Sequence, residues 1–369
     1  MNNSDKDAIE STRCGCSTGP RPSWVSGLVD TAVGSVDVVR TSLDGADRRG
    51  MVWCRISDRF RMHYAVPPGL YAIGTPTDGS PIFVSANYKY SFDCLRSHLH
   101  GIDGWILVLD TKGINVWCAA GKKTFSTCEL IRRIGETHLQ QVTTQRLLIL
   151  PQLGAPGVNA QTVKKETGFT IKYGPVDSAH IRAYLEAGYQ ATSAMRTASF
   201  SLADRVVLIP MELFPALRRF FRIHLIVFGL MGLGGQGILF INAWQYSAPL
   251  LWALFLALML GIIAHVLLLP WTPFRAFSIK GSLLGILGVA LWFWGNTNSF
   301  PSPYLLAAVF IGLPALSSYL ALNFTGCTTF TNPSGVKKEL RFAFPAYVTA
   351  AVLTAVALLL YKLEAIGFL

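Results

Sequence analysis

The sequence predicts an α/β fold, a Rossmann-like domain with a parallel sheet, followed by an all-α transmembrane bundle of five helices. Hydrophobic residues make up 51% of the 369 residues and charged residues only 14%, whereas soluble chains carry about 25% charge. The apolar excess begins at Arg218, and before that point short apolar runs alternate with helical patterns. We therefore expect a flexible N-terminal segment over 1–50, a ligand-binding domain over 51–217 and a transmembrane domain over 218–369.

The N-terminal segment is polar and carries a lone Cys-x-Cys pair, Cys14 and Cys16. This pair could bind a soft metal ion, but a tail without function is the simpler interpretation. The seven cysteines are odd in number and irregularly spaced, and the polar start lacks the pattern of a signal peptide. These features predict free thiols in a reducing cytosol.

Apolar, β-rich runs predict the strands of the second domain: Pro81–Ala86, Trp105–Leu109, Leu147–Leu150, Phe169–Tyr173 and Val206–Ile209. Helical patterns separate several of them. One places Phe92, Leu95 and Leu99 on one face, another opens with a capping box at Ser126, and a third follows Asp177. Strands that are apolar throughout and alternate with helices predict a buried parallel sheet.

Polar or glycine-rich loops follow these strands, at the edge where ligands of open α/β sheets bind. Neither of the glycine-rich nucleotide-binding patterns, GxGxxG or GxxxxGK[ST], is present. Several loops that converge on one crevice could enclose a large planar ligand. The candidate binding residues are Ser85, Ala86, Asn87, Tyr88, Asp110, Thr111, Lys112, Gly113, Asn115, Val116, Trp117, Cys118, Ala119, Ala120, Gly121, Lys122, Gln152, Leu153, Gly154, Ala155, Pro156, Gly157, Tyr173, Gly174 and Pro175.

The segment Asn115–Lys122, NVWCAAGK, contains the candidate metal ligand Cys118. A cysteine in the first turn of a helix meets free backbone N–H groups, which favour a thiolate, and a thiolate is a soft ligand for a late transition metal. The small residues after it would let a flat ring approach the backbone. Taken alone, a cysteine beside a tryptophan is usually core packing. That interpretation is kept for Cys54, Cys94, Cys128 and Cys327, while His98 and His100 are expected to be solvated or capping residues.

This segment resembles the cap-helix motif of the corrinoid protein of microbial mercury methylation, a relative of the corrinoid iron–sulfur protein of the acetyl-CoA pathway. The resemblance extends over 85–93, 105–122, 148–158 and 173–175, and to a five-span C-terminal bundle. Lys123 departs from the small residue expected there. The DxHxxG pattern of corrinoid proteins with a histidine ligand is absent from the sequence.

The resemblance implies cobalamin bound base-off, with the Cys118 thiolate as the lower cobalt ligand and Cys118 as the catalytic residue. It implies a corrinoid-dependent methyltransferase that moves a methyl group from Co(III) to Hg(II), giving methylmercury. A methyltetrahydrofolate-linked compound would supply the methyl group. The sequence has no four-cysteine cluster motif, so low-potential electrons would come from a ferredoxin-like partner with two 4Fe–4S clusters.

Five apolar stretches predict the transmembrane helices: Phe221–Ala243, Pro249–Leu269, Phe277–Gly295, Tyr304–Asn323 and Ala343–Tyr361. The formal net charge is +11, and from Arg218 onward nine Lys and Arg stand against two acidic residues. All of these bases except Lys362 fall on one side of such a bundle. The positive-inside rule then predicts a multi-pass protein of the cytoplasmic membrane, with a cytosolic N-terminal domain and the C-terminus outside. Basic residues beside membrane spans indicate topology and contact with anionic lipid, not nucleic-acid binding.

Other interpretations stay open at this point. The chain could be a membrane-anchored corrinoid methyl carrier of one-carbon metabolism, of the acetyl-CoA pathway type, or a non-enzymatic ligand-binding membrane adaptor. A thiol carrier of mercury is a third possibility, although such carriers usually use paired cysteines. The bundle is interpreted as an anchor or docking platform rather than a transporter, because the spans contain no acidic residue and only His224 and His265 are ionisable candidates near their ends.

Overall fold

The computed structural model describes residues 21–234, 237–238, 240–295, 302–328 and 333–369. The chain divides into two compact units, unit 1 (1–198) and unit 2 (199–369). The division lies nearer the N-terminus than the boundary expected at residue 217, because the first helices after Ala198 pack within unit 2. The Cys14–Cys16 pair lies outside the described residues.

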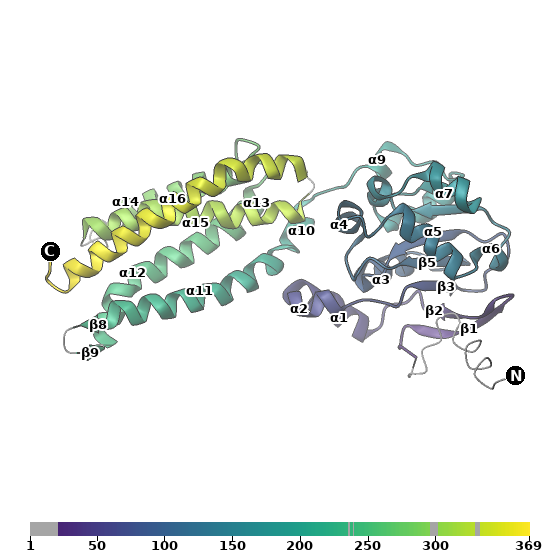
Figure 1. The fold of residues 1–369 in the computed structure, drawn as a ribbon, viewed down its shortest axis with the longest axis horizontal. Coiled ribbons are helices and arrows are strands. Elements are labelled where there is room, and N and C mark those ends of the chain that lie inside the picture. Colours follow the sequence, from purple (N-terminus) through teal and green to yellow (C-terminus); the bar gives the residue numbers. More distant parts are fainter. Residues whose placement is uncertain (1–20, 235–236, 239, 296–301, 329–332) are drawn as a thin grey trace, which may run out of the picture. The chain divides into compact units, whose positions relative to one another are not determined.

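Unit 1 is built on a seven-stranded sheet (Figure 1) with the strand order β1-β2-β3-β5-β4-β6-β7. Strands β5, β4, β6 and β7 are parallel, β3 runs antiparallel to β5, and β1 pairs with β2 in a hairpin. The expectation of a parallel sheet is thus confirmed for four strands. The strands are β1 (Val25–Thr31), β2 (Gly34–Val39), β3 (Gly69–Ile73), β4 (Ile82–Ala86), β5 (Gly104–Leu109), β6 (Leu147–Leu150) and β7 (Thr170–Tyr173).

Two expectations about this sheet are wrong. Residues 25–39 form β1 and β2 and contribute Val36 and Val39 to the core, so the segment 1–50 is not flexible over its described part. The run Val206–Ile209 forms no strand. It lies at the junction between α10 (Leu202–Val206) and α11 (Ile209–Gly232). The side chain of Arg205 donates hydrogen bonds to the backbone carbonyl oxygens of Val266 and Leu267, and these bonds hold the segment in place within unit 2.

Helices cover both faces of the sheet. Each of the three helical patterns in the sequence is confirmed, by α3, α5 and the pair η2–α8. The elements are α1 (Gly45–Ile56), α2 (Asp58–His63), α3 (Lys89–Ser97), α4 (Val116–Gly121), α5 (Thr127–Glu136), α6 (Leu139–Val142), η1 (Gln152–Gly157), α7 (Ala160–Thr167), η2 (Ser178–His180), α8 (Ile181–Glu186) and α9 (Ser193–Arg196).

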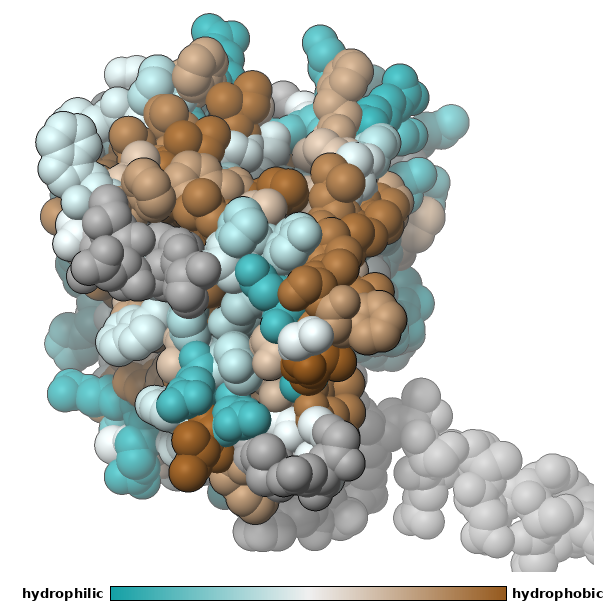
Figure 2. Space-filling model, turned by 90° about the vertical axis from the view of Figure 1, so that its left-hand side faces the viewer, coloured by the Kyte–Doolittle hydropathy of each residue, from teal (hydrophilic) through white to brown (hydrophobic). Residues whose placement is uncertain are grey.

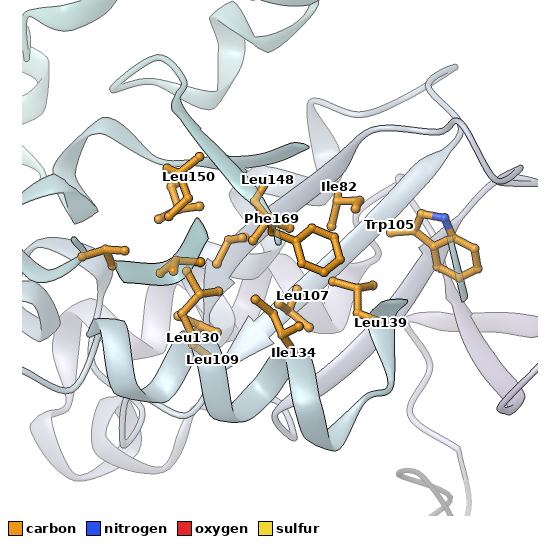
Figure 3. Packing of buried hydrophobic residues seen from close by; sticks show 14 of the residues in the cluster. Ile82, Trp105, Leu107, Leu109, Leu130, Ile134, Leu139, Leu148, Leu150 and Phe169 are labelled. Carbon is orange, nitrogen blue, oxygen red and sulfur yellow. The ribbon is translucent and has the colours of Figure 1, made fainter. Parts of the chain in front are cut away.

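Successive residues along the strands point to opposite faces of the sheet and pack into two hydrophobic cores, one on each face. Ile82 and Leu107 join Leu130 of α5 and Phe169 in the first core (Figure 3). Their neighbours along the strands, such as Phe83 and Ile106, point to the other face and pack with α3 and α8. Because a strand side chain alternates between faces, a strand buried on both sides must be apolar at every position. This is the pattern that β4 and β5 show in the sequence.

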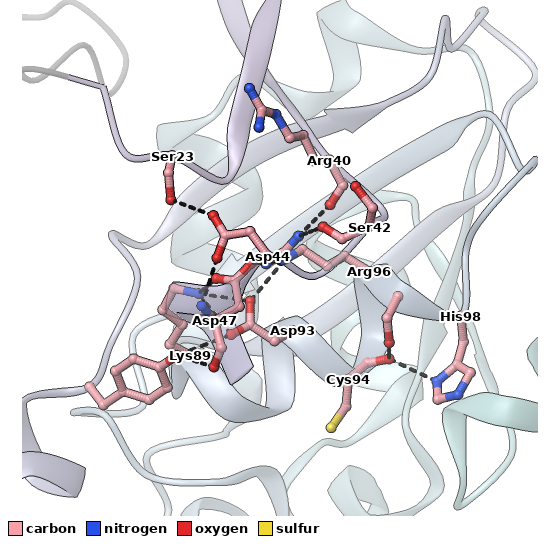
Figure 4. Close-up of polar contacts among 12 residues, drawn as sticks. Ser23, Arg40, Ser42, Asp44, Asp47, Lys89, Asp93, Cys94, Arg96 and His98 are labelled. Atoms are coloured by element: carbon pink, nitrogen blue, oxygen red, sulfur yellow. Dashed lines mark hydrogen bonds and ion pairs between the residues drawn. The ribbon is translucent and has the colours of Figure 1, made fainter. Parts of the chain in front are cut away.

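A buried ionic cluster joins α1 to α3 (Figure 4). Lys89 Nζ lies 2.7 Å from a carboxylate oxygen of Asp47 and 2.7 Å from one of Asp93. Arg96, which is 0% exposed, donates to the same two carboxylates at 2.6 and 2.8 Å and to the carbonyl of Arg40. Each buried charge therefore has opposite charges beside it, as burial in a protein interior requires.

Unit 2 is helical, and among its described residues four helices are, by length and composition, able to cross a membrane. Its remaining elements are α12 (Phe240–Leu258), the π-helix η3 (Met259–Ala264), α13 (His265–Leu268), α14 (Phe277–Gly295), α15 (Pro303–Asn323), η5 (Phe324–Cys327), α16 (Pro333–Ala365) and the short pair β8 (Leu233–Gly234) and β9 (Gly237–Ile238). The four candidate spans are Phe240–Leu268, Phe277–Gly295, Pro303–Gly326 and Ser334–Ala365.

The expected first span, Phe221–Ala243, is not one continuous helix. Helix α11 ends at Gly232, where the glycine-rich run forms the β8–β9 turn, and α12 starts at Phe240. Large hydrophobic side chains remain on the outer surface of unit 2, among them Leu225, Trp252 and Leu291. Figure 2 shows residues of high hydropathy in brown on the face that it presents. His265 is fully buried against the rings of Phe277 and Phe324.

Candidate functional site

The candidate site lies at the carboxyl edge of the parallel strands. From β4 the chain moves to β5 on one side and later to β6 on the other, so the strand order reverses at β4. Such a switch point separates the loops that follow neighbouring strands and leaves a crevice between them. The loops after β4, β5, β6 and β7 are those that the sequence singled out, and the structure brings them to this one edge.

Asn87 joins the loop after β4 to the loop after β5. Its Oδ1 atom accepts from the backbone N–H of Thr111 at 3.0 Å, from the Thr111 hydroxyl at 2.8 Å and from the N–H of Gly113 at 2.9 Å. Gly113 has φ +69°, a left-handed conformation in which glycine is not strained. The buried amide of Asn87 therefore fixes the shape of the loop that leads to Cys118.

Asp110 and Lys112 form the outer part of the same loop. Lys112 Nζ lies 2.5 Å from Asp110 Oδ2, and the backbone N–H of Asp110 donates to Glu129 of α5 at 2.8 Å. Burial alone would raise the pKa of Asp110, but hydrogen bonds from the side chain and backbone of Lys112 outweigh it and lower that pKa. Asp110 thus remains a carboxylate at neutral pH.

Cys118 lies in the first turn of α4, where Asn115 caps the helix. The Asn115 side chain accepts a hydrogen bond of 2.9 Å from the backbone N–H of Cys118, as an N-cap residue should. The thiol is half-buried, and burial raises the pKa of Cys118 although Lys122, Arg61 and Asn115 act to lower it. Burial therefore acts against the thiolate that the helix position favours, whereas coordination to a metal ion deprotonates a thiol.

Helix α4 packs closely on η1, the segment that follows β6. A Cβ atom added to Gly157 would lie 2.0 Å from the carbonyl oxygen of Phe125 and 3.2 Å from Ala120 Cα. The hydroxyl of Tyr173 donates to Val158 just beyond η1 at 2.9 Å. At the exposed end of the helix, by contrast, a Cβ added to Gly121 would meet no atom within 4 Å. Helix α4 is therefore closely packed on the side that faces η1, and it has free space beside Gly121 at its C-terminal end.

The predicted site residues fall into two groups. Ser85, Ala86, Asn87 and Thr111 are buried and support the loops, as are Ala119, Ala120, Gly154, Gly174 and Pro175. Tyr88 and Gly113 are also buried, and the remaining candidates are at least partly exposed. Exposed or half-buried positions around the thiol include Trp117, Gly121, Lys122 and Leu153. Contact of any of these residues with a cofactor stays a prediction.

Sequence reasoning missed the contribution of α2. Arg61 is close enough to act electrostatically on the Cys118 thiol, and a Cβ on Gly113 would lie 3.3 Å from the carbonyl oxygen of Met62. Lys123 has φ +62°, a left-handed conformation that favours glycine, directly after the motif. A cavity of about 190 Å³ between β2, β3 and α5, lined by Asp37, Tyr71 and Arg133, shares no lining residue with the Cys118 site.

The residues present fit a corrinoid. A corrin ring would supply most of the ligand atoms of its metal, so a single protein donor would be enough, and the Cys118 sulfur could be that donor, on a helix whose outer end has no Cβ at Gly121. Across the described residues no group of three or more His, Cys, Asp or Glu is placed to hold a bare metal ion. Cys118 and the small residues after it would face the ring, with Asn115 holding the helix start.

Comparison with known proteins finds relatives of the part of the chain that contains Cys118. Residues 58–185, which run from α2 to α8 and contain Cys118, match the family of the CO dehydrogenase/acetyl-CoA synthase delta subunit. The chain is 34% identical over 123 residues to the acetyl-CoA decarbonylase/synthase complex subunit gamma of Archaeoglobus fulgidus and 32% identical over 123 residues to that of Methanopyrus kandleri. Each match covers 33% of this chain and 26% of the relative. The matched segment thus spans only about a quarter of the length of these subunits.

Proposed function

We propose that unit 1 binds a corrinoid as a carrier of methyl groups, with the sulfur of Cys118 as the axial ligand below the cobalt. The observation that carries this proposal is a half-buried thiol on a capped helix at the switch point of a parallel sheet. The similarity to subunits of the acetyl-CoA decarbonylase/synthase complex supports the class of protein. It favours a methyl carrier of the acetyl-CoA pathway type.

The chain's own residues would bind and orient the cofactor. When bound, a corrinoid would supply a cobalt centre that accepts and releases methyl groups, and the Cys118 thiolate would be a soft ligand for that metal. Asn115 fixes the start of α4, and Asn87 fixes the loop before it. The close packing of Gly157 on Phe125 keeps Cys118 in register with the loop after β6.

Mercury(II) is the second candidate methyl acceptor. The motif Asn115–Lys122 resembles that of the mercury-methylating corrinoid protein, and unit 2 supplies helices that could cross a membrane. Hg(II) is an electrophile, which suits transfer of a methyl group together with its electrons. The proposal includes a methyltetrahydrofolate-linked methyl donor, a ferredoxin-like electron donor and a location in the cytoplasmic membrane with unit 1 in the cytosol.

The ligand assignment is tested with the full chain in detergent, mixed with cobalamin in reducing buffer. The wild type and Cys128→Ala, which removes an exposed thiol, should retain cobalamin with the absorption spectrum of sulfur-ligated cobalt. Cys118→Ala should lose that spectrum and all methyl transfer. An unchanged spectrum in Cys118→Ala would refute the assignment.

The acceptor is tested separately with the methyl-loaded wild type. Methyl transfer to Hg(II) is compared with transfer to a nickel-containing acetyl-CoA synthase at equal cobalt concentration. Faster transfer to the synthase supports the carrier of the acetyl-CoA pathway type, whereas faster formation of methylmercury supports the second candidate. A chain that binds no cobalamin in the first experiment would instead be a ligand-binding membrane adaptor.

A further inference from the structure

Helices α1 and α2 present a basic and apolar surface that the proposed function does not use. These helices pack on one another. What we call the α1–α2 surface consists of their exposed arginines and exposed large apolar side chains: Arg48, Arg49, Val52, Trp53, Arg59, Phe60 and Met62. Asp58 and His63 of α2 are exposed beside them. Val52 is 56%, Trp53 53% and Met62 54% exposed. Large apolar side chains that gather at the surface of a soluble domain mark an interaction site.

The spacing of residues in α1 explains why this surface faces outward. Asp47, Gly50 and Cys54 are buried, and a Cβ on Gly50 would lie 2.2 Å from the hydroxyl of Tyr64. The opposite side of the helix carries Arg48, Arg49, Val52 and Trp53, at the spacing i, i+1, i+4 and i+5. Arg48 lies beside Val52, and Arg49 beside Trp53, because residues four apart are neighbours on an α-helix. Each arginine of α1 on this side therefore has a large apolar side chain next to it.

Within the part of the chain that the structure describes, the positive charge of this surface is not neutralised by ion pairs. Arg48, Arg49 and Arg59 form no ion pair among the described residues, whereas the nearby acids are engaged elsewhere. Asp44 caps α1, Asp47 belongs to the buried cluster, and Asp58 pairs with Arg61. The surface therefore fits an anionic partner that also accepts apolar side chains.

We propose that the α1–α2 surface docks on the anionic headgroup region of the lipid bilayer. This inference rests on the proposed membrane location, since the spans of unit 2 would keep unit 1 covalently beside lipid. Tryptophan prefers the membrane interface, arginine binds anionic headgroups, and helices that combine them lie in the interfacial plane. An acidic protein would satisfy the charges, but it would have to compete with a bilayer that is always present at high local concentration.

Docking would connect the membrane to the corrinoid site. The carbonyl oxygen of Met62 lies against Gly113, and Arg61 acts on Cys118, so α2 borders the loop that leads to α4. A bilayer that holds α1 and α2 would therefore hold one wall of the site. The side of unit 1 next to Cys118 would then lie at the level of the headgroups.

The test is amide hydrogen exchange of the full chain in nanodiscs of phosphatidylglycerol, in nanodiscs of phosphatidylcholine and in neutral detergent micelles. Peptides covering residues 45–63 should exchange most slowly in phosphatidylglycerol, and added salt should abolish the difference. Near an anionic surface each arginine is worth about a fivefold change in binding constant. The triple variant Arg48→Gln/Arg49→Gln/Arg59→Gln should therefore exchange in phosphatidylglycerol as fast as the wild type does in phosphatidylcholine.

A matched control is Lys164→Gln/Lys165→Gln, which removes two exposed bases from α7 and should leave the protection of 45–63 unchanged. Equal exchange in both lipids would overturn the proposal. Equal protection in detergent would also overturn it, because the surface would then be covered by another part of the chain or by a second copy. Co-elution of the chain with the nanodiscs reports insertion of unit 2 independently, so a failure of the membrane location is distinguished from a failure of docking.

Discussion

At the scale of single residues, the position of Cys118 depends on one hydrogen bond from its own backbone. Asn115→Ala removes the acceptor for the Cys118 N–H and should destabilise unit 1 by about 1 kcal/mol, the usual value of an N-cap. Because the start of α4 would then fray, retention of cobalamin should weaken as well. Urea unfolding monitored by pulse proteolysis, together with cobalamin retention on gel filtration, checks both effects.

Asn115→Asp is the conservative control, since an aspartate caps a helix as well as an asparagine. It should restore both stability and cobalamin retention. If Asn115→Ala lost stability but bound cobalamin as tightly as the wild type, the cap would serve folding alone and would not position the thiol.

Substitutions at two glycines of the site distinguish an effect on protein packing from an effect on contact with the ligand. Gly157→Ala would force a Cβ to within 2.0 Å of the Phe125 carbonyl, so it should destabilise unit 1 and displace α4 from η1. Gly121→Ala meets no protein atom within 4 Å and should leave the stability unchanged. If the ring lies over the end of α4, Gly121→Ala should nevertheless weaken cobalamin binding. Equal cobalamin affinity in the wild type and Gly121→Ala would place the ring away from this helix end.

The sequence predicts some of these roles and not others. Asn115 precedes a helical segment, so its capping role is a local property of the chain. The roles of Asn87 and Arg61 depend on which loops meet at the sheet edge, and no local pattern reveals that arrangement. The half-burial that raises the pKa of Cys118 also comes from tertiary packing. Helix position alone does not reveal this opposing effect of burial.

At the scale of elements, the ionic cluster between α1 and α3 makes stability depend on pH. Burial alone would raise the pKa of Asp47, but hydrogen bonds from Lys89 and Arg96 outweigh it and hold the pKa below its ordinary value of 3.8. A carboxyl whose pKa is lower in the folded than in the unfolded state stabilises the fold above the unfolded pKa. That contribution is lost as the pH falls below about 4 and through the folded pKa.

We therefore expect the urea midpoint of unit 1 to fall between pH 5 and pH 3 more steeply in the wild type than in Asp47→Asn. Arg96→Met should cost about 3–5 kcal/mol at pH 7, because it leaves two buried carboxylates with one cation. Asp58→Asn, at an exposed ion pair, is the control and should change stability by less than about 1 kcal/mol. A wild type and Asp47→Asn with the same dependence on pH would contradict the assigned ionisation.

The sequence predicts correctly those strands whose amino-acid composition follows from burial on both faces of the sheet. β4, β5 and β6 are apolar runs covered on both faces, and the sequence shows them. β1 alternates between half-buried and exposed residues at the sheet margin, so its residues Ser26, Asp30 and Thr31 resemble a loop. Val206–Ile209 has the β-branched composition of a strand, but the bonds of Arg205 to the carbonyls of Val266 and Leu267 hold it in a helical segment.

At the scale of the whole molecule, the topology depends on whether α11 crosses the membrane. Among the described residues, four other helices have the length and composition to cross a membrane. Helix α11 is not one of these four, although it packs along α12 and η3 within unit 2. Its 24 residues would reach about 36 Å as an α-helix. A fifth crossing also puts Arg218, Arg219 and Arg222 on the same side as Arg275 and Lys337, which the positive-inside rule favours.

Five crossings predict that the C-terminus lies outside the cell while unit 1 lies in the cytosol. An alkaline phosphatase fused after Leu369 should then be active, and a green fluorescent protein fused at the same point should be dark. The reverse result would mean an even number of crossings, with α11 on the cytosolic surface. A phosphatase fused after Ala198 is the matched control and should be inactive.

The reversed direction of β3 has a practical consequence for work with isolated fragments. Because β3 runs against β5, the polypeptide reaches it from the edge where β4 and β5 end. The backbone N–H of Val66 donates to the carbonyl of Asn87, and that of Lys89 donates to Tyr64, each at 2.9 Å. Residues before β3 therefore flank the candidate site, even though they precede every strand of the parallel set β4–β7. A shortened polypeptide that started at β3 would keep Cys118 and all four parallel strands but would lack this flank, so the minimal fragment for spectroscopy should start ahead of β1.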